Sequence, residues 1–470
     1  MEKIKIYQRT KTIIADLITP VALYMTLRDK FRKPLLLESA DYHDRSDSKS
    51  FICLNPLAGF EVKGQRIMVK GINYSFNEEV KDNSEVLRIF KDFHNSFDYT
   101  YSNENVPTGG LYGYTSFEAV RYFEDIELHN IPNRIKDNPD MIYNFFEYVL
   151  VFDHFKNELH IVYHTNEADD DGQRALNQML NLIQCHSVNP FGFKIEGEEE
   201  SPIDDHTYRN YVEKGIQHCQ RGDVFQVVLS RSFTQKFKGD EFCVYRALRR
   251  LNPSPYLFYF DYGNFKIFGS SPEAQILVND NKAHINPIAG TVRRGNSQKE
   301  DLIRAQHLQK DPKENAEHVM LVDLARNDLS KHNGNVYVDT YGEIQYFSHV
   351  IHMVSKVTAD LDSMNESLQL FADTFPAGTL SGAPKYRALQ IIDENESQTR
   401  NFYGGSIGYF GFDGSINHAI IIRSAVSKNN TLCYQAGAGI VVDSSPQGEL
   451  EEVNNKVAAL RKAIINAESL

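Results

Sequence analysis

Two pairs of glutamates in the chain repeat one spacing. In DPKENAEHVMLVDLARNDL (311–329), Glu314 and Glu317 lie three residues apart, and Glu449 and Glu452 repeat that spacing in SSPQGELEEVNNKVAALRKAI (444–464). Both segments carry apolar residues at helical intervals, so each pair is expected on one face of a helix. Hard divalent cations prefer oxygen ligands, and Mg²⁺ takes one or two carboxylates together with waters and an anionic substrate. The same spacing is also common on exposed helices that bind no metal.

The first of these helices is predicted to begin after Asp311, which reads as its N-cap. Glu317 then falls on the apolar stripe that contains Leu321, where a carboxylate costs free energy unless it has a partner. We therefore interpret the two pairs as one possible metal site. Its direct ligands would be Glu317 and Glu452, and Glu314 and Glu449 would act through water.

Three further residues could hold an anion. Arg423 interrupts the apolar run HAIIIRSAV (418–426), where its guanidinium needs a carboxylate or phosphate partner. An internal salt bridge would satisfy it equally well. In QAGAGIVV (435–442), Gly437 and Gly439 would let an anion approach the backbone N–H groups, although a bulge or tight packing explains glycines as readily.

His352 and Thr379 are candidates for contacts with a reacting group. His352 shares a predicted strand face with Val350 and Val354, a setting typical of an ordinary core histidine. Histidine is nevertheless the side chain best suited to proton transfer near neutral pH. Thr379 lies in PAGTLSGAPK (376–385), a segment rich in glycine and proline that is predicted to be a loop leading into a helix.

Composition excludes several classes of protein. The 470 residues carry a formal net charge of −13 without a basic block, which argues against nucleic acid or an anionic membrane as a partner. The five cysteines are scattered and form no CxxC motif, so neither a zinc site nor a disulfide framework is indicated. The N-terminus lacks the apolar core of a signal peptide, and no apolar run reaches membrane-spanning length. A cytoplasmic location is expected.

Many consecutive strands joined by short turns favour an α+β fold. We expect large, mostly antiparallel sheets packed as a sandwich with helices outside. The stretches 343–357 and 418–428 are each read as one strand. The acidic run IEGEEESPIDD (195–205) is predicted to be a solvated, flexible boundary between an N-terminal region, 1–195, and a catalytic domain, 203–467.

Several separated segments occur in the order typical of a known family. They are PIAGTVRRG, EHVMLVDLARNDL, FPAGTLSGAPK, IIIRSA and QAGAGIVVDSSPQGELEEVNNK. The chain resembles the chorismate-utilising enzymes, and within them the large subunits of anthranilate synthase. The resemblance is dense from about residue 205 to residue 463 and extends into the first half through GGLYGYTSFEAVRYFEDI.

The resemblance implies a role for each matching residue. Glu317 and Glu452, with Glu314 and Glu449 close by, would bind an Mg²⁺ ion that bridges to the ring carboxylate of chorismate. Arg423, Tyr409 and the backbone of Gly437 and Gly439 would hold the enolpyruvyl carboxylate. Gly290 and Thr291 would line the ring, and Lys456 would balance charge at the metal. His352, as general acid, and Thr379 would face the departing C4 hydroxyl.

Two positions select among the family's reactions. Relatives that add water have a lysine where this chain has Gln226, and aminodeoxychorismate synthases have a lysine where this chain has Ala289. The resemblance therefore implies attack by ammonia at C2, loss of the C4 hydroxyl and elimination of pyruvate to give anthranilate. Two alternatives remain open: an enzyme that stops at aminodeoxyisochorismate, and a catalytically silent subunit that senses an amino acid.

A partner and an inhibitor are also implied. No glutaminase module is recognisable, so a separate glutamine amidotransferase subunit would supply ammonia. Tryptophan would inhibit at a site that matches the family's spacing. Its residues would be Glu38, Ser39, Lys49, Pro255, Tyr256 and Leu257, the last of which replaces the usual methionine.

Overall fold

The structure is a computed structural model. It describes residues 3–39, 48–100, 106, 108–128, 138–168, 170, 172–184, 191–331, 335–346 and 350–470, without the side chains of Thr291 and Asn365. The strands are β1 (Ile4–Ile14), β2 (Leu35–Glu38), β3 (Lys49–Lys63), β4 (Arg66–Lys70), β5 (Ser75–Glu79), β6 (Phe97–Tyr99), β7 (Gly110–Thr115), β8 (Met141–Asp153), β9 (Glu158–Thr165), β10 (Phe193–Glu200), β11 (Gln226–Gly239), β12 (Tyr256–Asp261), β13 (Lys266–Ser271), β14 (Ala274–Asn279), β15 (Lys282–Ile285), β16 (Ile288–Arg293), β17 (Val336–Tyr346), β18 (Val350–Asp360), β19 (Gly382–Ala383), β20 (Ser406–Gly411), β21 (Ile416–Ile420), β22 (Ser424–Lys428) and β23 (Thr431–Ile440). The helices are α1 (Pro20–Leu27), α2 (Ser84–His94), α3 (Gln173–Gln184), α4 (Asp205–Arg221), α5 (Phe242–Leu251), α6 (Gln298–Lys310), α7 (Pro312–Ser330), α8 (Ser367–Thr374), α9 (Gly378–Ser381), α10 (Lys385–Asn395) and α11 (Pro446–Ala467), with 3₁₀ turns η1 (Phe117–Tyr122) and η2 (Met364–Glu366).

The sheets form two series of strands that diverge from the long pair β3 and β8. This pair is antiparallel from Lys49 opposite Asp153 to Val62 opposite Met141. From β3, pairings lead through β2, β12, β13, β22, β23 and β11 to β10. From β8, they lead through β7, β20, β21, β14, β15 and β18 to β16 and β17. The antiparallel α+β architecture expected from the sequence is therefore confirmed.

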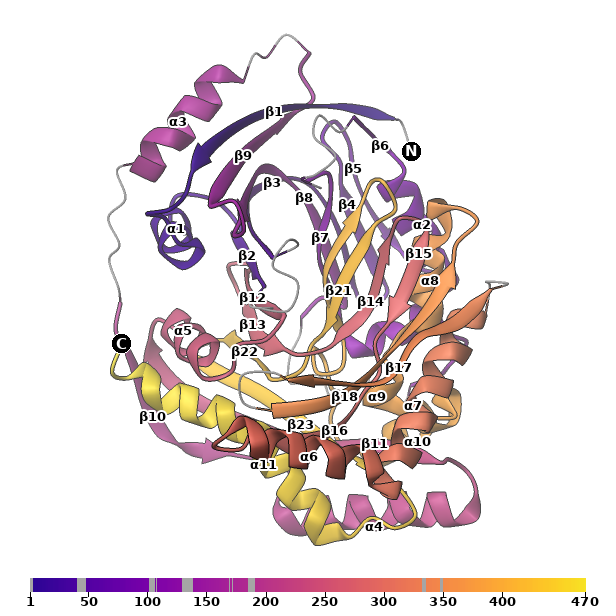
Figure 1. The fold of residues 1–470 in the computed structure, drawn as a ribbon. Helices are drawn as coiled ribbons and strands as arrows, with labels where there is room; N and C mark the ends of the chain where they lie inside the picture. Colours follow the sequence, from indigo (N-terminus) through magenta and orange to yellow (C-terminus); the bar gives the residue numbers. More distant parts are fainter. Residues whose placement is uncertain are drawn as a thin grey trace.

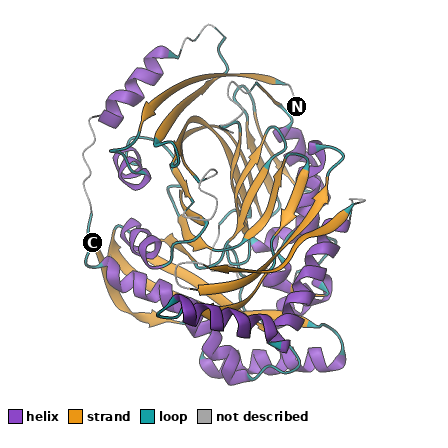
Figure 2. Ribbon diagram, viewed as in Figure 1, coloured by secondary structure: helices purple, strands orange, loops and turns teal. Residues whose placement is uncertain are grey.

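Two large apolar clusters cover the two faces of the sheets. One is built only from strand and loop side chains of both series, among them Phe51, Phe258 and Ile421, and so occupies the interior of the sandwich. The other packs helix residues such as Leu248 and Val453 against the outer faces of the strands. The strands accordingly lie inside and the helices outside (Figures 1 and 2). This is the arrangement in which each sheet buries both of its faces.

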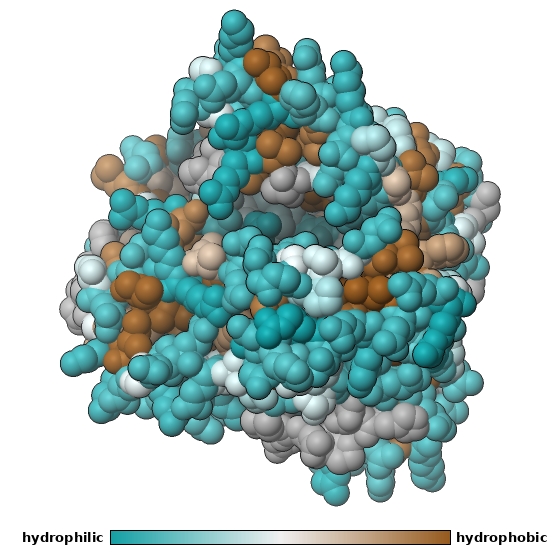
Figure 3. All heavy atoms as spheres, turned by 90° about the horizontal axis from the view of Figure 1, so that it is seen from below, coloured by the Kyte–Doolittle hydropathy of each residue, from teal (hydrophilic) through white to brown (hydrophobic). Residues whose placement is uncertain are grey.

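The outer surface is mainly polar. The face seen from below, on which α4 and α11 lie, carries mostly hydrophilic side chains with separate hydrophobic patches (Figure 3). Of the helices that the structure describes, none is both long and apolar enough to cross a membrane.

The sequence suggested that the acidic run 195–205 is a flexible linker, and this was wrong. Its first part belongs to β10, which pairs with β11 and places Ile195 opposite Phe237, and its last residue begins α4. Cations hold its carboxylates, because Arg461 lies 2.7 Å from Glu199 and Lys238 contacts Glu196. A strand with few apolar residues is stable here because its backbone is paired and its charges have partners. The division into 1–195 and 203–467 remains a prediction, and strand pairs β2–β12 and β7–β20 cross it.

Two segments that were read as single strands are interrupted. Stretch 343–357 contributes to β17 and β18, which pair antiparallel with Tyr346 opposite Ile351. Stretch 418–428 is divided into β21 and β22 at Ile421–Arg423. Both errors have one cause. A continuous apolar run is compatible with one long strand and equally with two shorter strands, and neither run contains the glycine or proline that usually marks a break.

Candidate active site

Helix α7 presents the first acidic pair as the sequence predicts. The Asp311 carboxylate accepts hydrogen bonds from the backbone N–H groups of Lys313 (2.9 Å) and Glu314 (3.3 Å), which fixes the start of the helix. Glu317, one turn further, is half-buried. Burial, followed by repulsion from Glu314 and Glu452, raises the pKa of its carboxyl. A carboxyl whose charge is disfavoured by other carboxylates is suited to binding a cation.

Helix α11 supplies the second pair. Its N-cap Ser445 accepts a hydrogen bond from the N–H of Gly448, and Glu449 follows in the first turn. Glu449 Oε2 is buried and has no hydrogen-bond partner among the described residues. Glu452 forms an ion pair with Lys456 at 2.7 Å, and the Lys456 Nζ also donates to the carbonyl of Gly437 at 2.9 Å. Lys456 therefore connects the acidic helix to the glycine-rich end of β23.

The two helices border one cavity of about 730 Å³, which is large enough for a small organic ligand. Ten of the residues singled out in the sequence line it: Gln226, Glu317, His352, Thr379, Arg423, Gly437, Gly439, Glu449, Glu452 and Lys456. Glu314 borders a smaller hollow beside Leu308 instead. The tertiary structure thus brings together segments that are more than 200 residues apart in the chain.

The acidic wall of this cavity fits a magnesium ion. Within the described part of the chain, no three histidine, cysteine, aspartate or glutamate side chains lie close enough to hold a metal by themselves. Mg²⁺ does not need such a cage, because it binds through one or two carboxylates, waters and substrate oxygens. Glu317 and Glu452 supply that number, and the unpaired oxygen of Glu449 adds an acceptor beside them.

Arg423 lies at the break between β21 and β22, not within a strand. Its φ of 49° places a non-glycine residue in the left-handed region, so the surrounding strands must hold it there. None of the described residues forms a hydrogen bond with its guanidinium, and removal from bulk water lowers its pKa. Glu273 offers partial compensation by raising this pKa. An arginine with open donors on a cavity wall is suited to a carboxylate ligand.

Glu273 is a site residue that the sequence did not indicate. It lies on the cavity wall just after β13, and its Oε1 accepts a hydrogen bond of 2.9 Å from the Thr379 hydroxyl. Burial raises the pKa of Glu273 to about 7, while Thr379, Arg423 and Lys456 act in the opposite direction. In the sequence, Glu273 follows Pro272 in GSSPE (269–273), and an acid at that position was the only available signal.

His352 and Gly290 form a second polar corner. His352 Nδ1 lies 3.2 Å from the carbonyl of Gly290, which can only accept, so the proton of the neutral ring is on Nδ1. Burial lowers the pKa of His352, as does Arg423. Gly290 has a φ of 63°, and a Cβ there would lie 2.5 Å from Leu308, so glycine is required. Thr291 pairs with His352 across β16 and β18.

Gln226 occupies the opposite wall. Its Oε1 is buried and has no partner within the described residues. A Cβ on Gly439 would lie 2.4 Å from Gln226 Nε2, so the glycine gives the amide its place. Ala289 is buried in β16.

Tyr409 does not lie at the substrate cavity, and this prediction was wrong. Its ring packs in the sandwich interior, 5.4 Å from Tyr112 and 6.0 Å from Phe51. Tyr403 lines the cavity instead, and its hydroxyl lies next to Gly437. The two tyrosines lie six residues apart on either side of a glycine-rich turn, and spacing alone could not choose between them.

This correction has a direct test in a matched pair of variants. Tyr403→Phe should lower kcat/KM for the substrate roughly tenfold, because one polar contact at the cavity is worth about 1–1.5 kcal/mol. Tyr409→Phe should leave kcat/KM within about twofold, since its hydroxyl lies outside the cavity. Steady-state kinetics on both purified variants decides the matter, and equal effects would reject the assignment of Tyr403.

The residues expected to bind an inhibitor lie together at β2, β3 and β12. Leu257 pairs with Glu38, and Lys49 begins the neighbouring strand. Glu38 is buried and accepts hydrogen bonds from the Tyr245 hydroxyl (2.5 Å) and from Arg249 Nε (3.1 Å). Three further residues complete this group: Ser39, Pro255 and Tyr256.

Known families and proteins resemble this chain over nearly its whole length. A family model described as chorismate binding enzyme matches residues 36–462. Anthranilate synthase component 1 of Aquifex aeolicus is 36% identical over 97% of this chain and 94% of its own length. The protein of the same name from Neisseria meningitidis serogroup B is 38% identical over 95% and 93%.

Solved structures of related enzymes are also similar to this chain. Anthranilate synthase component I of Streptococcus pneumoniae superposes with a TM-score of 0.79 at 30% identity, over 96% of this chain and 99% of that chain. The menaquinone-specific isochorismate synthase of Escherichia coli shares the fold, with a TM-score of 0.72 at 19% identity and coverage of 99% and 96%.

Proposed function

Since the chain belongs to the chorismate binding enzyme family, we propose that it converts chorismate and ammonia to anthranilate and pyruvate, the first step of tryptophan synthesis. The names of its relatives over nearly the whole chain support this reaction. One observation carries the proposal: a single cavity has an open arginine, Arg423, on one wall and carboxylates of α7 and α11, including Glu317, on another. Such a cavity suits a substrate with two carboxylates, one bound directly and one through a cation.

The substrate's carboxylates find complementary groups on this chain. Arg423 and the backbone at Gly437 and Gly439 would hold the enolpyruvyl carboxylate, because the guanidinium has no other hydrogen-bonding partner in the described structure. Glu317 and Glu452 would hold Mg²⁺ next to the ring carboxylate, with Glu449 beside them. When bound, the ion supplies Lewis-acid withdrawal of electrons through that carboxylate.

Loss of the C4 hydroxyl needs a proton donor, and Glu273 is the better candidate. With a pKa of about 7, a large fraction of Glu273 is protonated at neutral pH. His352, whose pKa is lowered, is mostly neutral there and holds its Nδ1 proton toward Gly290. We therefore assign proton donation to Glu273, oriented by Thr379, and a supporting position elsewhere on the cavity wall to His352.

Ammonia is favoured over water as the nucleophile because positions 226 and 289 carry no basic side chain. Gln226 carries no base that could activate water, and its free amide oxygen can accept an N–H of ammonia. With Ala289 in β16, no lysine from that position reaches the ring. Ammonia then attacks C2 while the C4 hydroxyl leaves as water, and loss of the C2 proton with pyruvate gives the aromatic product.

The proposed function is tested with the purified chain alone. Incubation with chorismate, MgCl₂ and an ammonium salt at raised pH should give anthranilate, detected by its fluorescence and mass, together with equimolar pyruvate. Omission of any one component should remove the product. Accumulation of a non-fluorescent species with the mass of aminodeoxyisochorismate would indicate an enzyme that stops at the intermediate. No reaction at all would indicate a silent sensing subunit.

The rate should depend on pH in the direction set by Glu273. A general acid must be protonated, so the rate per concentration of unprotonated ammonia should fall as pH rises through about 7. Glu273→Gln should remove this limb of the profile and lower kcat by roughly 10²- to 10⁴-fold, the usual value of general acid catalysis. If the limb persists in Glu273→Gln, another group donates the proton.

The name component 1 of the relatives implies a second component. We propose a glutamine amidotransferase subunit that delivers ammonia, because free ammonia is scarce at neutral pH. The chain alone should be active with ammonium salt and inactive with glutamine. Glutamine-dependent activity of the pure chain would contradict this part of the proposal.

Feedback inhibition by tryptophan is proposed at β2, β3 and β12. Saturating tryptophan should lower the rate with ammonia, whereas phenylalanine should not. Glu38→Gln should raise the half-inhibitory tryptophan concentration at least about tenfold, since a hydrogen bond to a charged group is worth about 1.5–3 kcal/mol. Activity without inhibitor should be nearly retained, because Glu38 contacts Tyr245 and Arg249, not the substrate cavity. Equal inhibition of both proteins would place the site elsewhere.

A further inference from the structure

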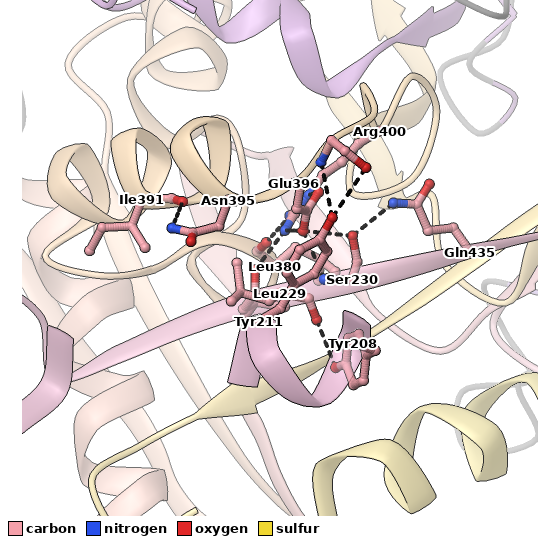
Figure 4. A network of polar contacts seen from close by, with 12 residues as sticks. Tyr208, Tyr211, Leu229, Ser230, Leu380, Ile391, Asn395, Glu396, Arg400 and Gln435 are labelled. Carbon is pink, nitrogen blue, oxygen red and sulfur yellow. Dashed lines mark hydrogen bonds and ion pairs between the residues drawn. The ribbon is translucent and has the colours of Figure 1, made fainter. Parts of the chain in front are cut away.

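A buried ion pair lies directly behind the wall of the substrate cavity. Arg400 and Glu396 are 2% and 3% exposed, and their side chains form a two-point contact at 2.6 and 2.9 Å (Figure 4). Burial of two charges is costly, and the pair gains stability only when its remaining hydrogen-bonding groups also have partners. The partners of this pair identify its role.

The guanidinium of Arg400 joins two separate parts of the cavity wall. Its NH1 donates to the carbonyl of Leu380 and its NH2 to the carbonyl of Val228, both at 2.6 Å. Val228 in β11 and Leu380 in α9 both line the cavity, and Leu380 follows Thr379 directly. Four hydrogen bonds in one plane therefore fix the distance between β11 and the helical turn that carries Thr379.

The carboxylate of Glu396 extends the connection to a third part of the wall. Glu396 Oε1 accepts from the backbone N–H (2.7 Å) and the hydroxyl (2.8 Å) of Ser230. The same hydroxyl accepts from Gln435 Nε2 at 2.7 Å, and Gln435 lines the cavity (Figure 4). The ring of Tyr403, a fourth lining residue, lies 5.7 Å from the Arg400 guanidinium.

The N-terminal half of the chain contacts the same arginine. The ring of Phe117 in η1 lies 4.5 Å from the guanidinium. The backbone of Asn401, the next residue after Arg400, donates to Glu118 Oε1 at 3.1 Å and accepts from the N–H of Phe117 at 2.8 Å. The first half of the chain thus helps to hold Arg400 in place.

We propose that Arg400, locked by Glu396, is a positioning residue that sets the geometry of the substrate cavity through Val228, Leu380 and Tyr403. Its particular effect is to place the Thr379 hydroxyl on Glu273. A lysine could keep the charge but not the planar set of donors, since an ammonium has three tetrahedral donors. The inference rests on the proposed function, because its readouts are those of the ammonia reaction.

The test compares Arg400→Lys and Glu396→Gln with a matched control, Arg28→Lys. Arg28 forms a two-point ion pair with Asp240 at the end of α1, with side-chain exposures of 9% and 12%, and neither residue lines the cavity. All variants are first checked by circular dichroism and melting temperature. We expect kcat with ammonia to fall roughly 10- to 100-fold in Arg400→Lys, because a misplacement of about 1 Å in an active site can cost 10²-fold. The kcat of Arg28→Lys should stay within about twofold of the wild-type value.

A pH profile separates positioning from general loss of stability. Thr379 lowers the pKa of Glu273, alongside Arg423 and Lys456, whose places the variants leave unchanged. Loosening Thr379 should therefore move the falling limb of the rate profile to higher pH in Arg400→Lys and not in Arg28→Lys. Folded Arg400→Lys and Glu396→Gln proteins with wild-type kcat, KM and pH limb would overturn the inference.

If Arg400→Lys does not fold, Ser230→Ala decides. This variant keeps the ion pair and removes only the hydroxyl between Glu396 and Gln435, so a several-fold loss of kcat supports positioning and unchanged kinetics reject it. Failure of the wild-type chain to form anthranilate would instead reject the proposed function. The two failures are thus distinguishable.

Discussion

Glu317→Gln should abolish magnesium-dependent turnover while leaving the fold intact. The amide cannot replace a carboxylate as an Mg²⁺ ligand, and Lewis-acid stabilisation is worth several kcal/mol, so kcat should fall roughly 10²- to 10³-fold. The folded state should gain stability, because burial disfavours the charged form of Glu317, and Glu314 and Glu452 repel it. The melting temperature of the metal-free protein should therefore rise, by about 1 °C for each kcal/mol gained in a chain of this length.

The sign of the pH effect on stability follows from the same rise in the pKa of Glu317, which burial causes first and repulsion second. The pKa of Glu317 is raised in the folded protein, so the folded state holds the proton to higher pH than the unfolded state. Without metal, stability should decline as pH rises from the unfolded pKa through the folded one, and Glu317→Gln should show a smaller decline. Glu451→Gln is the control, since Glu451 is the exposed neighbour of Glu452 and contacts Gln447. Unchanged Mg²⁺ dependence in Glu317→Gln would reject the metal assignment.

Arg423→Met should lose affinity for chorismate with little loss of structure. Truncation of an arginine that binds a carboxylate in a cavity costs about 3 kcal/mol, which is roughly a 10²-fold rise in Kd. The affinity of Arg423→Lys for chorismate should lie between those of the wild type and Arg423→Met, because lysine retains a charge without the planar pair of donors. Isothermal titration of each variant with chorismate and MgCl₂, in the absence of ammonia, measures binding without turnover.

The control for this pair is Arg387→Met. Arg387 is a surface arginine that forms an ion pair with Glu394 at 3.0 Å, so its loss should change affinity by less than about twofold. Arg423→Met should also melt at a higher temperature than the wild type when ligand is absent, because a guanidinium poor in partners is removed from the interior. Wild-type affinity in Arg423→Met would exclude this arginine from the substrate site.

Local patterns determined the helices and the acidic pairs. Asp311 and Ser445 both cap helices, and the intervals between apolar residues placed Glu317, Glu449 and Glu452 on defined faces. These features could be predicted because a helix has one period and its caps depend on neighbouring residues only.

The tertiary structure alone decided which polar residues share the cavity. Glu273 and Tyr403 line it and Tyr409 does not, although all three lie in strands or turns of similar composition. Pairing between strands that are far apart in the chain sets these positions. Each strand has two faces, and its own sequence does not show which face borders the cavity and which packs in the core. The Arg400 and Glu396 pair has the same origin, since its partners Val228 and Leu380 come from elements more than 100 residues apart. The chain's own sequence thus determined the chemistry that was available, and long-range packing determined which of those groups could act on one molecule.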